Sequence, residues 1–202
     1  MAELTKQEIS RIANGIGLPY AVFAAFIEVE SGGKAFDEKT GKIIIQFEPH
    51  IFARYLTQFK VKFSISSTVV GKRKIYTINA KGLTIRNGVE GQRAENNAYD
   101  IAMQIHPEAA MLSTSFGMGQ IMGFNYAALG YDSVKEMVKA FNESEFEQVR
   151  GIASFILSST SLKFALLKKD WRTAARIYNG PNYAAGRYHI KLENAHTKYS
   201  SL

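Results

Sequence analysis

The 202-residue sequence contains no cysteine, so neither a disulfide framework nor thiolate chemistry is available to it. It has no run of eighteen or more apolar residues, which argues against a membrane span. Its amino terminus, MAELTKQEISRIANGIGLPY, lacks the basic start, continuous apolar core and small-residue cleavage site of a secretory signal. Internal repeats, linkers and low-complexity segments are also missing. We therefore expect one soluble domain over residues 1–202, made and held in the cytoplasm.

What the sequence does contain is a 46% apolar fraction, enough for a substantial core, and a formal net charge of +7. Residues 60–93 carry the whole excess of charge, because eight bases lie there with a single acid, Glu90. The bases are Lys60, Lys62, Lys72, Arg73, Lys74, Lys81, Arg86 and Arg93. A localised basic surface attracts anionic polymers. Nucleic acid, lipopolysaccharide and teichoic acid all fit this charge, and so does a plain solvated hairpin.

The first half of the chain predicts two helices followed by a small β element. Thr5-Lys6-Gln7-Glu8 matches a capping box, which predicts a helix over residues 6–14. Pro19 suits the first position of a second, buried helix that ends at Ser31-Gly32-Gly33. KIIIQF predicts a strand over residues 42–47, and EPHIFARYL predicts a helix directly after it.

The rest of the chain changes pattern twice. Apolar and polar residues alternate from residue 60 to about 86 around Gly71-Lys72-Arg73, which predicts an antiparallel hairpin carrying the basic residues. Helical patterns return from Asn97. The helices expected there cover residues 97–105, 107–112, 117–128, 133–140, 143–159, 161–168, 171–178 and 187–198. The chain is therefore predicted to be α+β and mostly helical, with residues 60–93 as a basic, β-rich insertion.

Glu30 is the first candidate for chemistry. It continues the apolar stripe of the second helix, four residues after Phe26 and three after Ile27, whereas Glu28 points about 200° away from it. A carboxylate at a helix carboxyl end faces the negative end of the macrodipole, and apolar burial also disfavours its charge. Both effects would keep Glu30 protonated, as a general acid must be. An exposed glutamate that closes a helix is the competing interpretation.

Three segments, in chain order, resemble the motifs of goose-type lysozymes and lytic transglycosylases. Glu30-Ser31-Gly32-Gly33 looks like their Glu-Ser motif, SFGMGQIM from Ser115 is similar to their Ser-x-Gly-x-x-Gln-Ile-Met segment, and Tyr178-Asn179-Gly180-Pro181 resembles the third. A closer match is to the N-acetylmuramidase family of phage endolysins. That resemblance rests on VESGG, FEPHIF, SFGMGQIMGFN and YNGPNYAAGRY, and it covers most of the chain outside residues 60–93.

The resemblance implies a lysozyme-like domain that hydrolyses the β-1,4 bond between N-acetylmuramic acid and N-acetylglucosamine. It makes Glu30 the catalytic acid and aligns Glu48 with the second acidic residue. Glu48 lies between the predicted strand and helix, where a helix amino end should keep it ionised. Two carboxyl groups with separated pKa values are what glycoside hydrolysis uses. Helix capping is an alternative role for Glu48, and Asp37 and Glu38 remain alternatives for the second carboxylate.

Other residues of the three motifs are expected to bind the sugar. Gln120 offers both a donor and an acceptor, and Gly117 and Gly119 would let the backbone approach a ligand closely. Tyr178 could stack on a sugar or hydrogen-bond near the acid, and Asn179 could hold a substrate amide. Their alternatives are a structural glutamine and an ordinary helix end. The resemblance adds two serines to the substrate-binding candidates: Ser31 and Ser115.

The expected partner is the peptidoglycan glycan strand, with anionic envelope polymers as candidates for residues 60–93. The four histidines show no ligand spacing, so no metal, cofactor or nucleic-acid partner is expected, and we expect a monomer without an integral membrane segment. The endolysin resemblance implies storage in the host cytoplasm until release to the wall. A lytic transglycosylase is the nearest rival, and a non-catalytic glycan-binding or phage structural protein is a rival from another class.

Overall fold

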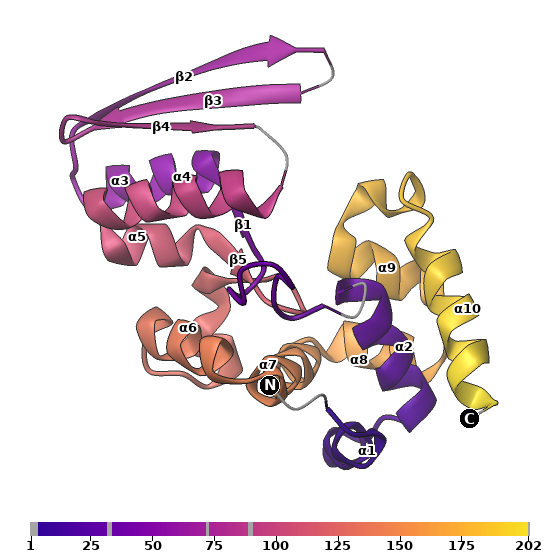
Figure 1. The fold of residues 1–202 in the computed structure, drawn as a ribbon. Helices are drawn as coiled ribbons and strands as arrows, with labels where there is room; N and C mark the ends of the chain where they lie inside the picture. Colours follow the sequence, from indigo (N-terminus) through magenta and orange to yellow (C-terminus); the bar gives the residue numbers. More distant parts are fainter. Residues whose placement is uncertain (1–3, 32–33, 72, 89–90, 202) are drawn as a thin grey trace.

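The computed structural model describes residues 4–31, 34–71, 73–88 and 91–201. Within these ranges it confirms the predicted α+β class, in which helices outweigh two small antiparallel sheets (Figure 1). The helices are α1 Lys6–Gly15, α2 Tyr20–Ser31, α3 Pro49–Gln58, α4 Gln92–Ile105, α5 Pro107–Leu112, α6 Val134–Glu143, α7 Glu145–Ser158, α8 Thr160–Leu167, α9 Trp171–Asn179 and α10 Tyr188–Ser200, with 3-10 turns η1 Gly123–Leu129 and η2 Pro181–Ala184. The strands are β1 Ile45–Phe47, β2 Phe63–Val70, β3 Arg73–Ala80, β4 Leu83–Asn87, β5 Thr114–Phe116 and β6 Ile121–Met122.

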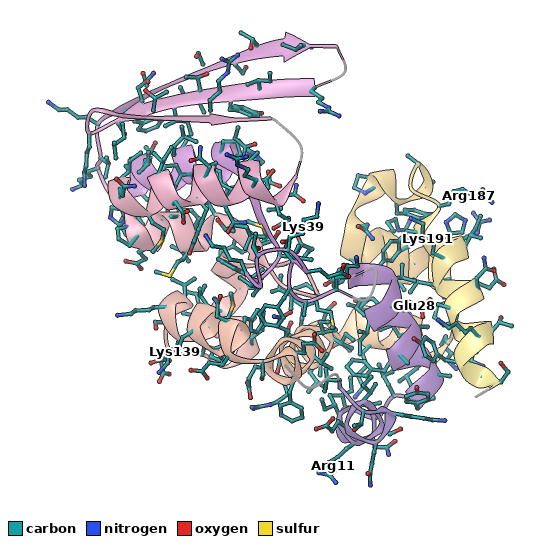
Figure 2. All side chains as sticks on the ribbon, viewed as in Figure 1. Arg11, Glu28, Lys39, Lys139, Arg187 and Lys191 are labelled. Carbon is teal, nitrogen blue, oxygen red and sulfur yellow. The ribbon has the colours of Figure 1, made fainter. Side chains whose placement is uncertain are left out.

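Two groups of elements form the molecule. In Figure 1 the sheet β2–β3–β4 covers α3 and α4 at the upper left, while α2, α9 and α10 pack together at the lower right. Each group has its own buried apolar cluster. Charged side chains such as Arg11 of α1 and Lys139 of α6 project from the outside of the helical part (Figure 2). The chain therefore presents two packed bodies joined by a central segment.

The helical part buries the middle of α2, from residue 22 to residue 27. Val22, Phe23 and Phe26 are fully inaccessible to solvent, and α2 packs most extensively against α10. Burial of a large apolar side chain contributes about 1.5–3 kcal/mol, so this helix stabilises the part it crosses. The predicted capping box at the start of α1 is present, with the Thr5 side chain accepting from the Glu8 backbone N–H. The sequence thus predicted both helices, although α2 begins at Tyr20, one residue after Pro19.

The β-rich part is fastened to α4 by apolar contacts and by one cation. Ile78 and Ile85 are fully buried in a cluster that includes Ala102 and Ile105 of α4. The Lys81 ammonium donates to the Ile105 carbonyl oxygen at 2.7 Å, where a helix end favours positive charge. The predicted hairpin is confirmed as β2 and β3. Strand β4 adds a third strand, which the alternation of apolar and polar residues did not distinguish from the hairpin.

Strand β1 connects the two parts. It pairs with β5 so that Gln46 faces Ser115 in the ladder, and β5 pairs with β6. Ile45 packs into the core of the helical part, while Phe47 packs into the core beneath β2–β3–β4. A three-residue strand therefore fixes both bodies relative to each other and leads directly into Glu48.

The predicted helix over residues 117–128 is wrong. The chain instead turns between β5 and β6 and then forms the 3-10 turn η1. Gly117 and Gln120 have φ values of +66° and +45°, which an α-helix cannot accommodate. The predicted strand is also shorter than residues 42–47, and α4 begins five residues before Asn97.

Among the described residues no single helix is long and apolar enough to cross a membrane. Helix α1 and residues 20–30 of α2 reach that length and composition only as a pair, which is bent by 109°.

Candidate active site

The Glu30 carboxyl group lies at the carboxyl end of α2, on the face predicted from the apolar stripe. Its Oε1 atom is buried and has no hydrogen-bond partner among the described residues. Burial raises the pKa of Glu30 well above its ordinary value, because no donor or cation offsets the loss of water. The interpretation of Glu30 as an exposed helix end is therefore wrong. The group is suited to hold a proton at neutral pH.

Tyr178 lies beside Glu30. Its ring packs edge-on against Phe26 and Phe155, with centroid distances of 4.9 and 5.3 Å, and its hydroxyl donates to the Gly119 carbonyl oxygen at 2.7 Å. Burial, followed by the nearby charge of Glu30, raises the pKa of Tyr178 well above its ordinary value. Tyr178 thus stays neutral and couples the acid to the loop between β5 and β6.

Asn179 and Ser31 lie at the ends of their helices. Asn179 ends α9 with an exposed side chain, close in sequence to Tyr178. The backbone of Ser31 closes α2 next to Glu30, and its side chain lies outside the described residues.

Gly117 and Gly119 are required by internal packing, while close approach of a ligand to their backbone stays a prediction. A Cβ at Gly117 would collide with the Gln148 side chain, and one at Gly119 would lie 2.6 Å from Cγ1 of Ile152. Gln148 is fully buried; its Oε1 accepts from the Met118 N–H at 2.7 Å and its Nε2 donates to the Phe141 carbonyl. A buried glutamine of α7, which the sequence pattern did not single out, therefore holds this loop in place.

The Gln120 amide is held by hydrogen bonds within the loop between β5 and β6. Its Nε2 donates to the Gly117 carbonyl oxygen at 2.8 Å, and its Oε1 accepts from the Ser115 hydroxyl at 3.0 Å. Its left-handed backbone, with φ of +45°, is a conformation that persists where surrounding contacts enforce it and is common at functional sites. Ser115 is buried, and its hydroxyl donates to Gln120. Ser115 therefore supports Gln120 from the interior of the protein.

Glu48 precedes α3 and lies in a more polar environment than Glu30. Its side chain makes no capping hydrogen bond, so the helix-capping alternative is wrong. Its Oε1 accepts from Gln46 Nε2 at 2.9 Å, and its Oε2 lies 3.4 Å from Nδ1 of His50. Burial and then the neighbouring Glu95 charge raise the pKa of Glu48, whereas His50 and Gln46 lower it. The helix amino end was predicted to keep Glu48 ionised, but the effect of partial burial on its pKa is larger. The upward shift of the Glu48 pKa is smaller than that of Glu30.

Two residues that sequence reasoning missed hold β1 from the side of α4. The Gln92 side chain accepts from the Ile45 N–H and donates to the Ile45 carbonyl, both at 2.9 Å, as a neighbouring strand would. The Glu95 carboxylate accepts from the Phe47 N–H at 2.9 Å. A Gln and a Glu three residues apart at a helix start share one face, and this spacing is the sequence feature that could have indicated their common role. They position the strand that leads into Glu48.

Contacts run continuously from Glu30 to Glu48. Tyr178 joins Glu30 to Gly119, the adjacent Gln120 contacts Ser115, and Gln46 pairs with Ser115 and donates to Glu48. The structure therefore brings Glu30, Ser115, Gln120, Tyr178 and Glu48 into one connected set. A buried carboxylic acid and a hydrogen-bonded carboxylate linked by this set suit acid-assisted cleavage of a glycosidic bond.

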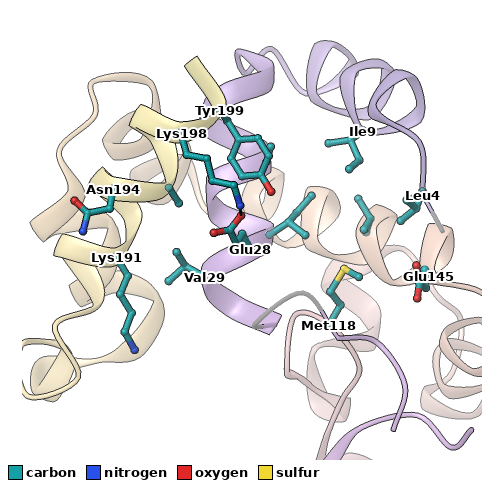
Figure 3. Close-up of a pocket in the computed structure, with 14 residues that line it drawn as sticks. Leu4, Ile9, Glu28, Val29, Met118, Glu145, Lys191, Asn194, Lys198 and Tyr199 are labelled. Carbon is teal, nitrogen blue, oxygen red and sulfur yellow. Dashed lines mark hydrogen bonds and ion pairs between the residues drawn. The ribbon is translucent and has the colours of Figure 1, made fainter. Parts of the chain in front are cut away.

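The remaining acidic candidates are engaged elsewhere. Asp37 accepts from Thr40 within a surface turn, and Glu38 pairs with Lys34 at 2.9 Å in an exposed ion pair. Glu28 pairs with Lys198 of α10 at 2.6 Å, in the wall of a separate hollow of about 870 Å³ between α2 and α10 (Figure 3). Glu28 and Glu30 thus face different surroundings, as the helical spacing predicted.

The histidines are dispersed over the fold. His106 stacks on Phe59 at 4.2 Å, His196 packs against Trp171, and His50 lies beside Glu48. Within the described ranges no three His, Cys, Asp or Glu side chains are grouped so that they could hold a metal ion.

A mostly helical α+β fold with a small sheet between two packed bodies matches the lysozyme-like fold of endolysins. Family and structural similarity together support a glycosidase-type enzyme that acts on peptidoglycan. The chain belongs to the N-acetylmuramidase family, whose model matches residues 19–200. A solved structure described as the Burkholderia AP3 phage endolysin is similar to it with a TM-score of 0.80 and 32% identity, over 98% of this chain and 71% of that one. No curated protein matches the chain.

Proposed function

We propose that this chain is a phage endolysin that hydrolyses the β-1,4 bond between N-acetylmuramic acid and N-acetylglucosamine. The observation that carries the proposal is the buried Oε1 of Glu30, which has no hydrogen-bond partner among the described residues and lies beside Tyr178. Family membership supports peptidoglycan as the substrate, and similarity to the AP3 phage endolysin supports a role in phage lysis. An endolysin would be made in the host cytoplasm and would reach the wall once the membrane is permeabilised.

The roles of the two glutamates follow from their surroundings. Glu30 donates its proton to the glycosidic oxygen as the carbon–oxygen bond breaks, and the positive charge that develops on the sugar is stabilised by ionised Glu48. Glu48 also accepts a proton from the water that supplies the new hydroxyl. Gln120 presents its amide edge between them, and Tyr178 and Asn179 contact the sugar on the side of Glu30.

A lytic transglycosylase is the second candidate, and the raised pKa of Glu48 favours it. That reaction needs the same acid but closes an anhydro ring without water. Digestion of purified peptidoglycan in ¹⁸O-water, followed by mass spectrometry, separates the two. Hydrolysis predicts reducing-end N-acetylmuramic acid with one solvent oxygen. Products made mainly of anhydro-muramic acid would assign the chain to the transglycosylases, and reducing-end N-acetylglucosamine would show that the other bond is cut.

A further inference from the structure

A hollow of about 460 Å³ lies where the start of β3 meets β1 and the start of α4. Its polar lining comes from three glutamines, one carboxylate and two cations: Gln46, Gln92, Gln120, Glu95, Arg73 and Lys74. Gln120 and Gln46 belong to the connected set around Glu30 and Glu48. The hollow is therefore an extension of the candidate active site toward the basic insertion.

Lys74 lies on the face of β3 that points toward the site. Side chains alternate along a strand, so Lys74 and Tyr76 share the face of Ile78, which is fully buried against α4. The Lys74 ammonium lies 5.0 Å from the Tyr76 ring centroid, and that ring lies 6.3 Å from the ring of His50. His50 contacts Glu48 at 3.4 Å. The Tyr76 and His50 rings thus form a series of contacts between the Lys74 ammonium and the Glu48 carboxylate.

The charge of Lys74 is available to a ligand. Among the described residues no carboxylate oxygen lies within 4.0 Å of its ammonium. One oxygen of the nearby Glu95 carboxylate, Oε2, accepts from the Phe47 N–H and from the Asn87 amide at 3.2 Å. An anionic group that enters the hollow on the side of Lys74 would meet its ammonium, while hydrogen bonds from two donors stabilise the Glu95 charge.

We propose that this hollow binds a carboxylate of the peptides attached to the lactyl group of muramic acid, with Lys74 as its cation. The proposal rests on the proposed function, since the glycan must lie between Glu30 and Glu48 for the peptide to reach Lys74. In intact strands the lactyl carboxyl group is bound as an amide, so the negative charges offered to the ammonium are the peptide carboxylates. Once an amidase has removed the peptide, the remaining carboxylate is that of the lactyl group itself, next to the sugar ring and away from Lys74. Part of the basic insertion is thereby a specificity element of the active site.

The test compares Lys74→Gln with Lys62→Gln in the full chain. Lys62 is exposed, belongs to the same insertion and precedes β2 at the end of the sheet opposite Lys74. The substrates are labelled glycan strands with intact peptides and the same strands after an amidase has removed the peptides. Lys74→Gln should raise KM about fivefold to tenfold on peptide-bearing strands, with kcat nearly unchanged, because a charge-assisted contact is lost. On peptide-free strands the increase should largely disappear.

Lys74→Arg should restore most of the wild-type KM, and Lys62→Gln should match the wild type on both substrates. An equal KM increase on both substrates, or an equal effect of Lys62→Gln that vanishes at high salt, would overturn the proposal in favour of general attraction to anionic polymers. A failed proposed function gives a different result, since the wild-type protein would then cleave neither substrate at this bond.

Discussion

Glu30 and Glu48 are the same residue type in two parts of the molecule that treat a carboxyl group differently. Glu30 ends a buried helix among aromatic rings, and its Oε1 has no partner within the described residues. Glu48 follows a short strand and contacts Gln46 and His50. Burial raises the pKa of both, but only Glu48 has neighbours that lower it again. The difference shows how packing alone can assign opposite proton-transfer roles to identical side chains.

The largest effect is expected for Glu30→Gln. Gln keeps the shape of the side chain but has no transferable proton, so turnover of peptidoglycan should fall about 10²–10⁴-fold. The measurement is release of soluble muropeptides from purified walls, with circular dichroism to show that the fold is retained.

Glu28→Gln is the matched control, two residues away on the same helix. It removes the exposed ion pair with Lys198, which contributes at most about 1 kcal/mol of stability. Activity should therefore stay close to wild type. A dead Glu28→Gln protein, or an active and folded Glu30→Gln protein, would reverse the assignment of the acid.

Glu48→Gln should reduce turnover less, by roughly 10²-fold, because the oxocarbenium and the attacking water lose a negative neighbour while the acid remains. Added azide should partly rescue Glu48→Ala, since a small anion can occupy the vacated space. The same azide concentration should leave Glu30→Ala inactive. Rescue of the Glu30 variant alone would exchange the two roles.

Glu95→Gln tests the effect of a neighbouring charge on Glu48. The Glu95 charge raises the pKa of Glu48, so its removal should lower that pKa. Glu48 must be ionised to act, so the acid limb of the pH profile of kcat should move to lower pH. The Gln oxygen can still accept from the Phe47 N–H, and the rate at the optimum should stay within about threefold of wild type. An unmoved acid limb would mean that another group sets it.

The smallest effect concerns stability. The folded state keeps Glu30 protonated above the pH at which the unfolded chain ionises it, so rising pH lowers the free energy of unfolding between those two pKa values. Glu30→Gln removes this loss. Its Tm should exceed that of the wild type at pH 7 by roughly 2–4 °C, as expected for about 1 kcal/mol, and the gain should shrink toward pH 4. A lower Tm at pH 7 would contradict apolar burial of the carboxyl group.

Sequence patterns predicted the elements whose signals are local. The capping box of α1, the apolar stripe of α2 and the alternation of β2 and β3 each depend on neighbouring residues, and these elements formed as expected. The segment after Phe116 failed because its conformation depends on tertiary contacts. Gln148, thirty residues further along the chain, accepts from the Met118 N–H, and Gln120 adopts a left-handed backbone.

The candidate active site also combines features that local sequence predicts with features that depend on tertiary contacts. The position of Glu30 on the buried face followed from residues three and four positions before it. The direction of the Glu48 pKa shift did not follow from its helix end, because Glu95 and the partial burial of Glu48 come from packing of α4 against β1. Charge alone also could not distinguish Lys74 from the other bases of residues 60–93, since only the sheet register places it beside Gln46 and Gln120.

The most direct measurement is an NMR titration of the two carboxyl groups in protein labelled with ¹³C at the glutamate carboxyl carbons. Comparison with Glu30→Gln and Glu48→Gln assigns the two resonances. We predict that Glu30 remains protonated at neutral pH and titrates well above Glu48, which ionises first. A Glu30 resonance that titrates in the ordinary range of glutamate, or below that of Glu48, would contradict the central claim that packing separates their roles.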